Sequence, residues 1–142
     1  MLHEHPILDA AVRVAIAFLL GLPVGFEQEK RTRSVGLRTY PLLSAGICGF
    51  LVTARGDSWG AIEQADVIYG VLNGIGFVGA GAIVRSPQVD AASVSVAVSL
   101  WVAGAIGVGV AYGAPLISAA LSLATVLVLW APFLHRRVKR RS

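Results

Sequence analysis

The sequence predicts an all-α membrane protein, a polytopic bundle of about five transmembrane helices. Hydrophobic residues make up 56% of the 142-residue chain and charged residues only 14%, whereas charged residues are about a quarter of a typical soluble domain. The apolar residues are gathered into runs that approach the ~20 residues a helix needs to cross a bilayer. The basic residues are concentrated between those runs. These observations indicate a single transmembrane domain covering residues 1–142.

The first apolar segment covers residues 7–26, which is long enough to cross a bilayer as a helix. Pro23 near its end should kink or terminate the helix. Arg13 would cost roughly 2.5 to 3.5 kcal/mol at the bilayer centre, so it should either snorkel to the interface or meet a carboxylate. We expect the segment to remain in the mature protein, because no basic n-region precedes it and it lacks a convincing cleavage site.

The other apolar segments are residues 39–54, 66–84, 91–111 and 116–134. Segment 39–54 reaches only about 24 Å as a helix, so it needs bilayer thinning, snorkelling arginines or burial among other helices to match a core of about 30 Å. Small residues recur every four positions in three segments and would give smooth faces for helix packing. These are Ala17, Gly21 and Gly25; Ala45, Gly49 and Thr53; and Ala103, Gly107 and Ala111.

The stretch 70–85, GVLNGIGFVGAGAIVR, places five glycines in an apolar run. In water these glycines would weaken a helix by up to ~1 kcal/mol each, but in lipid they let helix backbones touch. We therefore predict that this is the central helix of the bundle, and that leucine at Gly74 or Gly79 breaks its close contacts. The glycines assigned to helix packing are Gly70, Gly74, Gly76, Gly79 and Gly81.

The spacing of Gly74, Gly76 and Gly79 also matches a dinucleotide-binding fingerprint. That site needs a strand before the glycines, a soluble helix after them and an acidic residue about 20 positions further on. The downstream residues 91–111 contain no acid. A close-packed membrane helix is the favoured interpretation.

Residues that would support catalysis are sparse. The single Cys48 excludes an intramolecular disulfide, and its apolar neighbours predict a small buried hydrophobe. The histidines, His3, His5 and His135, lie at the chain ends, and the sequence has no paired acid site, no HExxH motif and no serine with a plausible base. We expect no enzyme activity and no cofactor.

The basic residues predict the orientation of the bundle. Cytoplasmic loops carry an excess of Lys and Arg, so the amino terminus should lie outside and the carboxyl terminus in the cytoplasm, which requires an odd number of spans. Because the basic clusters flank apolar segments, we expect them to face the bilayer headgroups and not nucleic acid. Only Arg55 lies on the outer side, against Lys30, Arg31, Arg33, Arg38, Arg85, Arg136, Arg137, Lys139, Arg140 and Arg141 on the cytoplasmic side.

Polar groups at membrane depth or at its edge are expensive and often functional. The acids at the end of the first segment would attract a cation or pair with Arg38. Asn73 would form an interhelical hydrogen bond or contact a solute, and Arg85 would anchor its helix. The candidate functional residues are Glu27, Glu29, Arg38, Thr39, Asn73 and Arg85.

Four motifs resemble the membrane domain of the MgtC/SapB family. They are GLPVGFEQE at 21–29, VGLRT at 35–39, NGIGFVGAGAI at 73–83 and SLWVAGAIG at 99–107. The resemblance covers about residues 10–112 in family-like order. The chain departs from the family pattern at Gln28, where Arg is frequent, at Tyr40, where His is common, and at 93–96, where a GLTT-like stretch is usual. We also expect no soluble carboxyl-terminal domain.

The resemblance implies a bacterial cytoplasmic-membrane protein, linked in some members to growth in low magnesium, survival in macrophages and control of the ATP synthase. Our leading hypothesis is a non-enzymatic protein that promotes adaptation to magnesium or acid stress, through contacts with other membrane proteins or by passing a small solute. A transporter or channel for Mg²⁺ or another ion is the alternative, but Mg²⁺ prefers convergent carboxylates, which the spans almost lack; the metal ligands, if any, stay unassigned. The small-residue faces would serve a homo-oligomer equally well.

Overall fold

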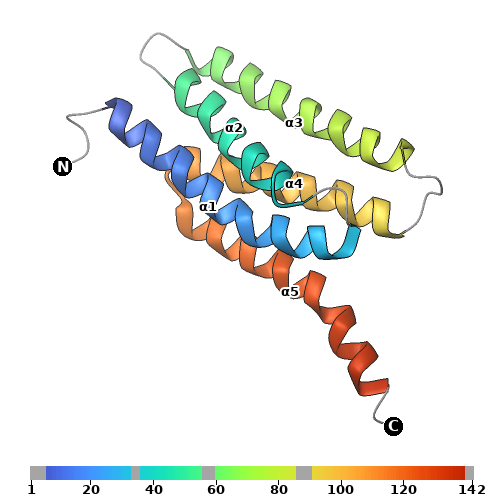
Figure 1. The fold of residues 1–142 in the computed structure, drawn as a ribbon. Helices are drawn as coiled ribbons and strands as arrows, with labels where there is room; N and C mark the ends of the chain where they lie inside the picture. The colour runs from blue at the N-terminus through green and yellow to red at the C-terminus, as the bar shows by residue number, and fades with distance from the viewer. Residues whose placement is uncertain (1–5, 33–35, 56–59, 86–90, 140–142) are drawn as a thin grey trace.

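The computed structural model describes residues 6–32, 36–55, 60–85 and 91–139, with side chains in the last range described for 92–131. In these residues the chain forms five helices and no strand (Figure 1). The helices are α1 (Pro6–Thr32), α2 (Thr39–Ala54), α3 (Ala61–Val84), α4 (Ala91–Ala111) and α5 (Pro115–Lys139). The predicted all-α class is confirmed. His3, His5, Arg33, Arg140 and Arg141 lie outside the described residues.

Helix α1 extends further than the apolar pattern predicts. Pro23 lies inside it and does not end it, and the helix continues past residue 26, where the predicted segment ends, through the charged residues to Thr32. Two contacts support this last turn: Lys30 pairs with Glu27, and the Thr32 hydroxyl donates to the Gln28 carbonyl. Side-chain pairs three or four residues apart stabilise a helix, so the polar composition did not prevent helix formation.

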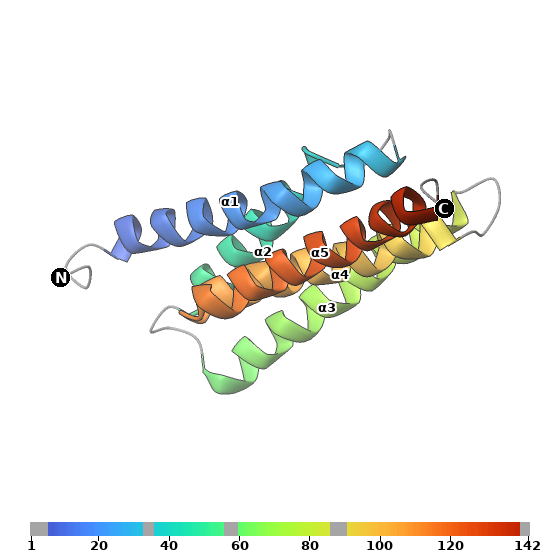
Figure 2. The same cartoon turned by 90° about the horizontal axis from the view of Figure 1, so that it is seen from below.

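Helix α4, and not α3, is at the centre of the bundle. It contacts all four other helices, whereas α3 contacts only α4 and, over a shorter stretch, α2. Both views place α3 at the edge of the molecule (Figures 1 and 2). The predicted central position of the glycine-rich helix is therefore wrong.

The glycines that permit close approach lie mainly on α1 and α4. A Cβ atom at Gly21 would lie 2.8 Å from the Pro41 Cα atom, and one at Gly107 would overlap the Ser44 carbonyl oxygen. The predicted small-residue faces of α1 and α4 are therefore confirmed. The corresponding face of α2 is not, because Thr53 is exposed and α2 buries its other side.

Two apolar clusters fill the bundle. One contains Cys48, which is buried as predicted, and the other surrounds Tyr40 and Leu100. Serine hydroxyls cross between helices: Ser44 donates to the Ala103 carbonyl and Ser122 donates to the Leu20 carbonyl. These bonds fix the helices to one another without leaving a polar group in hydrocarbon.

Helices α1, α3 and α4 are each long and apolar enough to span a membrane, and α2 and the first part of α5 form shorter apolar helices. The start of α1 and the end of α5 lie at opposite ends of the bundle (Figure 2). This arrangement is compatible with the odd number of spans. The direction in which the bundle is inserted remains a prediction.

Candidate functional site

One group of interior polar residues lies where the end of α1 meets α2 and α4. Gln28 is 1% exposed, and its amide nitrogen donates to the Ser99 hydroxyl at 2.6 Å and to the Ser95 carbonyl at 3.4 Å. Ser99 in turn donates to the Ser95 carbonyl at 2.7 Å. The Tyr40 hydroxyl, also buried, donates to the Val96 carbonyl at 3.4 Å. We call these residues, Gln28, Tyr40, Ser95, Val96 and Ser99, the Gln28 network.

The sequence identified Gln28 only as a departure from the family pattern. Its burial was not predicted. A signal was available, because Gln28 continues the line of Ala17, Gly21 and Val24 at helical spacing. A long amide on a packing face must find hydrogen bonds inside the bundle. The serine of the SLW motif, Ser99, supplies one of them.

Glu27 lies beside the network at the edge of the bundle and is 4% exposed. Its carboxylate accepts from Lys30 at 3.3 Å, and the Lys30 ammonium also lies 4.1 Å from the centre of the Phe26 ring. The predicted pairing of this acid with Arg38 is not seen among the described residues. Glu27 is thus a mostly buried carboxylate with a half-exposed lysine as its partner.

Glu29 holds the turn that leads into α2. Its carboxylate accepts the Leu37 backbone N–H at 2.7 Å. The turn packs so tightly on α1 that a Cβ at Gly36 would overlap the Glu29 side chain. Thr39, at the start of α2, donates its backbone N–H to the Gly36 carbonyl at 2.9 Å. Glu29 and Thr39 therefore organise the turn at residues 36–39, and Gly36 is the residue that lets it approach α1.

The other candidate residues contribute no hydrogen bond to the Gln28 network. Arg38 and Arg85 are exposed at helix ends. Asn73 is exposed in the middle of α3, which does not contact α1. The structure thus places Glu27, Glu29 and Thr39 near the Gln28 network and keeps Asn73 apart from them.

A second polar cluster stands at the opposite end of α4. Arg13 pairs with Asp9 at 2.7 Å and donates to the Val110 and Ala111 carbonyls at 3.3 Å. Arg55 donates to the Ala111 carbonyl at 2.5 Å and lies over the Tyr112 ring. Of the two expectations for Arg13, contact with a carboxylate is the one observed. Cations are favourable at a helix carboxyl end, so the two arginines tie α1 and α2 to the end of α4.

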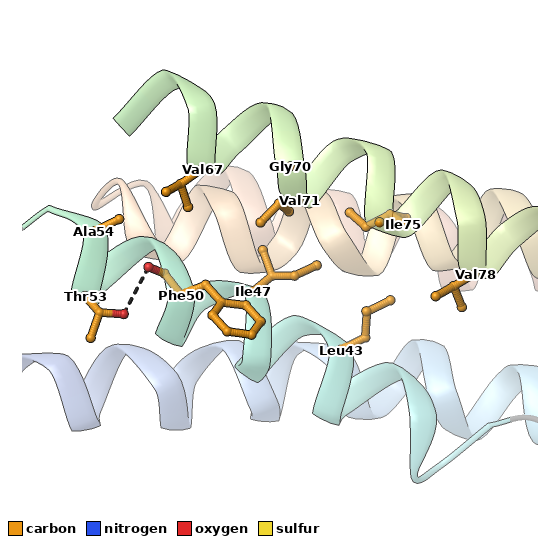
Figure 3. Close-up of a pocket in the computed structure, with 11 residues that line it drawn as sticks. Leu43, Ile47, Phe50, Thr53, Ala54, Val67, Gly70, Val71, Ile75 and Val78 are labelled. Atoms are coloured by element: carbon orange, nitrogen blue, oxygen red, sulfur yellow. Dashed lines mark hydrogen bonds between the residues drawn. The ribbon is translucent and has the colours of Figure 1, made fainter. Parts of the chain in front are cut away.

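Apolar grooves lie between neighbouring helices of the bundle. Figure 3 shows the one between α2 and α3, about 550 Å³ in volume, with Leu43 and Ile47 on one wall and Val71 and Ile75 on the other. Another, of about 640 Å³, lies between α4 and α5 and has Ser95, Ser99 and Thr125 in an otherwise apolar lining. Their composition suits acyl chains or the apolar face of another helix.

The described residues offer little for metal chemistry. Within them no three His, Cys, Asp or Glu side chains come together in a way that would hold a metal ion. Each buried side-chain nitrogen or oxygen in this part of the chain has a hydrogen-bond partner. The buried polar groups of these residues are therefore hydrogen-bonded, some between helices and some within one helix.

These features define a polytopic α-helical membrane protein whose interior polar groups are internally satisfied. The sequence profile of the MgtC family matches residues 14–140, and the chain belongs to this family. No solved structure matches it.

Two relatives illustrate the relationship. Protein MgtC of Brucella abortus (strain 2308) is 39% identical over 127 residues, which cover 87% of this chain and 50% of the relative. Protein MgtC of Salmonella typhimurium (strain 14028s / SGSC 2262) is 35% identical over 128 residues, which cover 88% of this chain and 52% of the relative. The chain thus spans about half the length of the curated relatives it matches.

Proposed function

We propose that this chain is a non-enzymatic protein of the bacterial cytoplasmic membrane that promotes adaptation to low magnesium or acid stress through contacts with other membrane proteins. Membership of the MgtC family supports the membrane location and the stress role that the resemblance implies. The mode of action is argued from the surface of the bundle.

The observation that carries the proposal is the contrast between the interior and the lipid-facing surface. Inside, Gln28, Ser44 and Ser122 use their polar atoms for contacts between helices. Outside, α3 exposes most of its length, and apolar grooves lie beside it and between α4 and α5. Surfaces of this kind associate with other helices through close packing and interhelical hydrogen bonds, which supports a binding role.

The test is growth of a strain from which the gene has been deleted. We expect growth to fail or slow only in magnesium-poor or mildly acidic medium, and to be restored by the wild-type gene. Normal growth of the deletion strain in both media would overturn the stress role. Affinity purification from mildly extracted membranes, with an unrelated membrane protein of similar size as control, would then identify partners.

Ion transport is the second candidate and rests on Glu27, a carboxylate with 4% exposure at the edge of the bundle. Buried acids inside membranes frequently mark ion pathways. The test is cation or proton flux in liposomes containing the purified protein or its Glu27→Gln variant. Flux that the variant abolishes would favour transport over the binding role, whereas absence of flux across Mg²⁺, other cations and pH gradients would exclude it.

A further inference from the structure

The side-chain amide of Asn73 lacks a hydrogen-bond partner within the described residues of one copy of the chain. Asn73 lies 12 residues after the first residue of α3 and 11 before the last, which is about 17 Å from either end at 1.5 Å per residue. It therefore lies near the middle of a bilayer core about 30 Å thick. Its side chain is exposed and makes no hydrogen bond to any residue in the described part of the chain.

Exposure at this depth means contact with hydrocarbon. An amide without a hydrogen-bond partner in such surroundings costs several kcal/mol, because no water is present to satisfy it. Gln28, an amide on the packing face of α1, is buried and bonded to Ser99. The difference between the two amides indicates that Asn73 takes its partner from another molecule in the membrane.

The helix surface around Asn73 is shaped for close approach. Gly70, Gly74 and Gly81 are exposed there, and a Cβ atom at any of them would meet nothing within 4 Å. Phe77, on the same side, is 82% exposed. Intramolecular packing uses the other side of α3, where Ile75 and Gly79 are buried. Small residues that flank a polar side chain allow helix backbones to come close enough for an interhelical hydrogen bond.

We propose that this surface of α3, formed by Gly70, Asn73, Gly74, Phe77 and Gly81, binds the same surface of a second copy of the chain around a two-fold axis along the membrane normal. An asparagine amide carries both donors and an acceptor, so two Asn73 side chains can each donate to the oxygen of the other. A two-fold interface brings identical residues together. A second copy inserted in the same direction presents its Asn73 at the same depth.

The surroundings of the surface are compatible with this arrangement. The acids on the exposed part of α3, Glu63 and Asp66, lie near its start, about two to three turns from Asn73. Helices that cross at Asn73 diverge from the crossing point, so these carboxylates separate toward the water. Gly70 and Gly74 also line the groove between α2 and α3 (Figure 3), and a helix lying on them would cover that side of the groove.

The test is self-association of the whole chain in liposomes, measured by energy transfer between donor-labelled and acceptor-labelled copies as the lipid-to-protein ratio is raised. We expect wild-type dimers that Asn73→Leu weakens by about threefold to thirtyfold in dissociation constant, the range for one interhelical hydrogen bond in a membrane. Gly74→Leu should also weaken them by blocking close approach. Gly46→Leu is the matched control, because Gly46 is an exposed glycine of α2 with open space around it.

A cross-linking measurement locates the contact. In a Cys48→Ser background, a cysteine introduced by Gly74→Cys should form an intermolecular disulfide on oxidation, whereas Gly46→Cys should not. Melting curves of the monomeric variants check that each has folded. A wild-type protein that stays monomeric at low lipid ratio, dimers unaffected by Asn73→Leu, or association only with a different membrane protein would each overturn the proposal. The stress role proposed above stands or falls separately, because its test does not depend on self-association.

Discussion

Helices α3 and α4 are both apolar and rich in glycine, yet they use that composition in opposite ways. In the apolar window of α4, 56% of the residues are buried, against 11% in that of α3. Glycines of α4 such as Gly107 lie against the backbone of α2, whereas Gly70, Gly74 and Gly81 of α3 face open space. A glycine-rich helix is therefore one that another helix can approach closely; the sequence of that helix alone does not say whether the neighbour belongs to the same chain.

The largest loss of stability that would test this comparison is expected for substitutions within α4. A methyl group at Gly107 would meet backbone atoms of Ser44 and Cys48, which cannot easily move, whereas one at Gly104 would meet the end of the Ile75 side chain, which can. Overpacking a core costs typically 1 to 3 kcal/mol, occasionally more, so Gly107→Ala should lower stability by about 3 kcal/mol and Gly104→Ala by clearly less. Thermal unfolding in detergent measures both. Equal losses at the two positions would contradict the packing described for α4.

A smaller loss is expected from the two amides. Gln28→Leu removes the bond to Ser99, and an interhelical hydrogen bond in a membrane protein contributes about 0.6 to 2 kcal/mol. Asn73→Leu on α3 is the control, because it removes no bond within the described chain and should leave the stability of the monomer unchanged. A double-mutant cycle of Gln28→Leu with Ser99→Ala should be less than additive; full additivity would show that the two side chains do not interact.

The third comparison concerns two arginines: Arg13, which contacts the carboxyl end of α4, and Arg85, at the carboxyl end of α3. Arg13→Gln loses its pairing with Asp9 and weakens its contact with the last carbonyls of α4, and should cost about 0.5 to 1 kcal/mol. Arg85→Gln at the end of α3 should cost less, since the Arg85 side chain is exposed. Chemical unfolding of both variants in one detergent measures the loss in the free energy of unfolding. A larger loss for Arg85→Gln than for Arg13→Gln would contradict this prediction.

Much of the fold was predictable because hydropathy and length fix where membrane helices lie. The faces of α1 and α4 were also predictable, since small residues at four-residue spacing mark close contacts. The position of α3 was not, because its glycines permit contact equally well with a helix of this chain or with one from another molecule. The extension of α1 through residues 27–32 was not predicted. Pairs such as Lys30 with Glu27 stabilise these residues only once they are helical, and their charges did not suggest a helix.

The candidate site was predictable only in part. Polar residues next to apolar segments indicated Glu27 and Glu29, but their partners, Lys30 and the Leu37 N–H, depend on how the turn folds back on α1. Gln28 was missed because it was compared with the family pattern and not placed on a helix face. Arg38 and Arg85 are exposed and make no hydrogen bond in the Gln28 network, and any role for them stays a prediction.

The central claim is that the glycines of α4, and not the open glycines of α3 such as Gly74, hold the monomer together. The most direct measurement is the melting temperature of Gly74→Ala beside that of Gly107→Ala, at a detergent concentration that keeps the protein monomeric. Alanine is favoured over glycine in a helix by up to ~1 kcal/mol, so Gly74→Ala should melt at or above the wild-type temperature while Gly107→Ala melts well below it. A loss at Gly74 as large as the loss at Gly107 would show that α3 packs inside the bundle and would contradict this account.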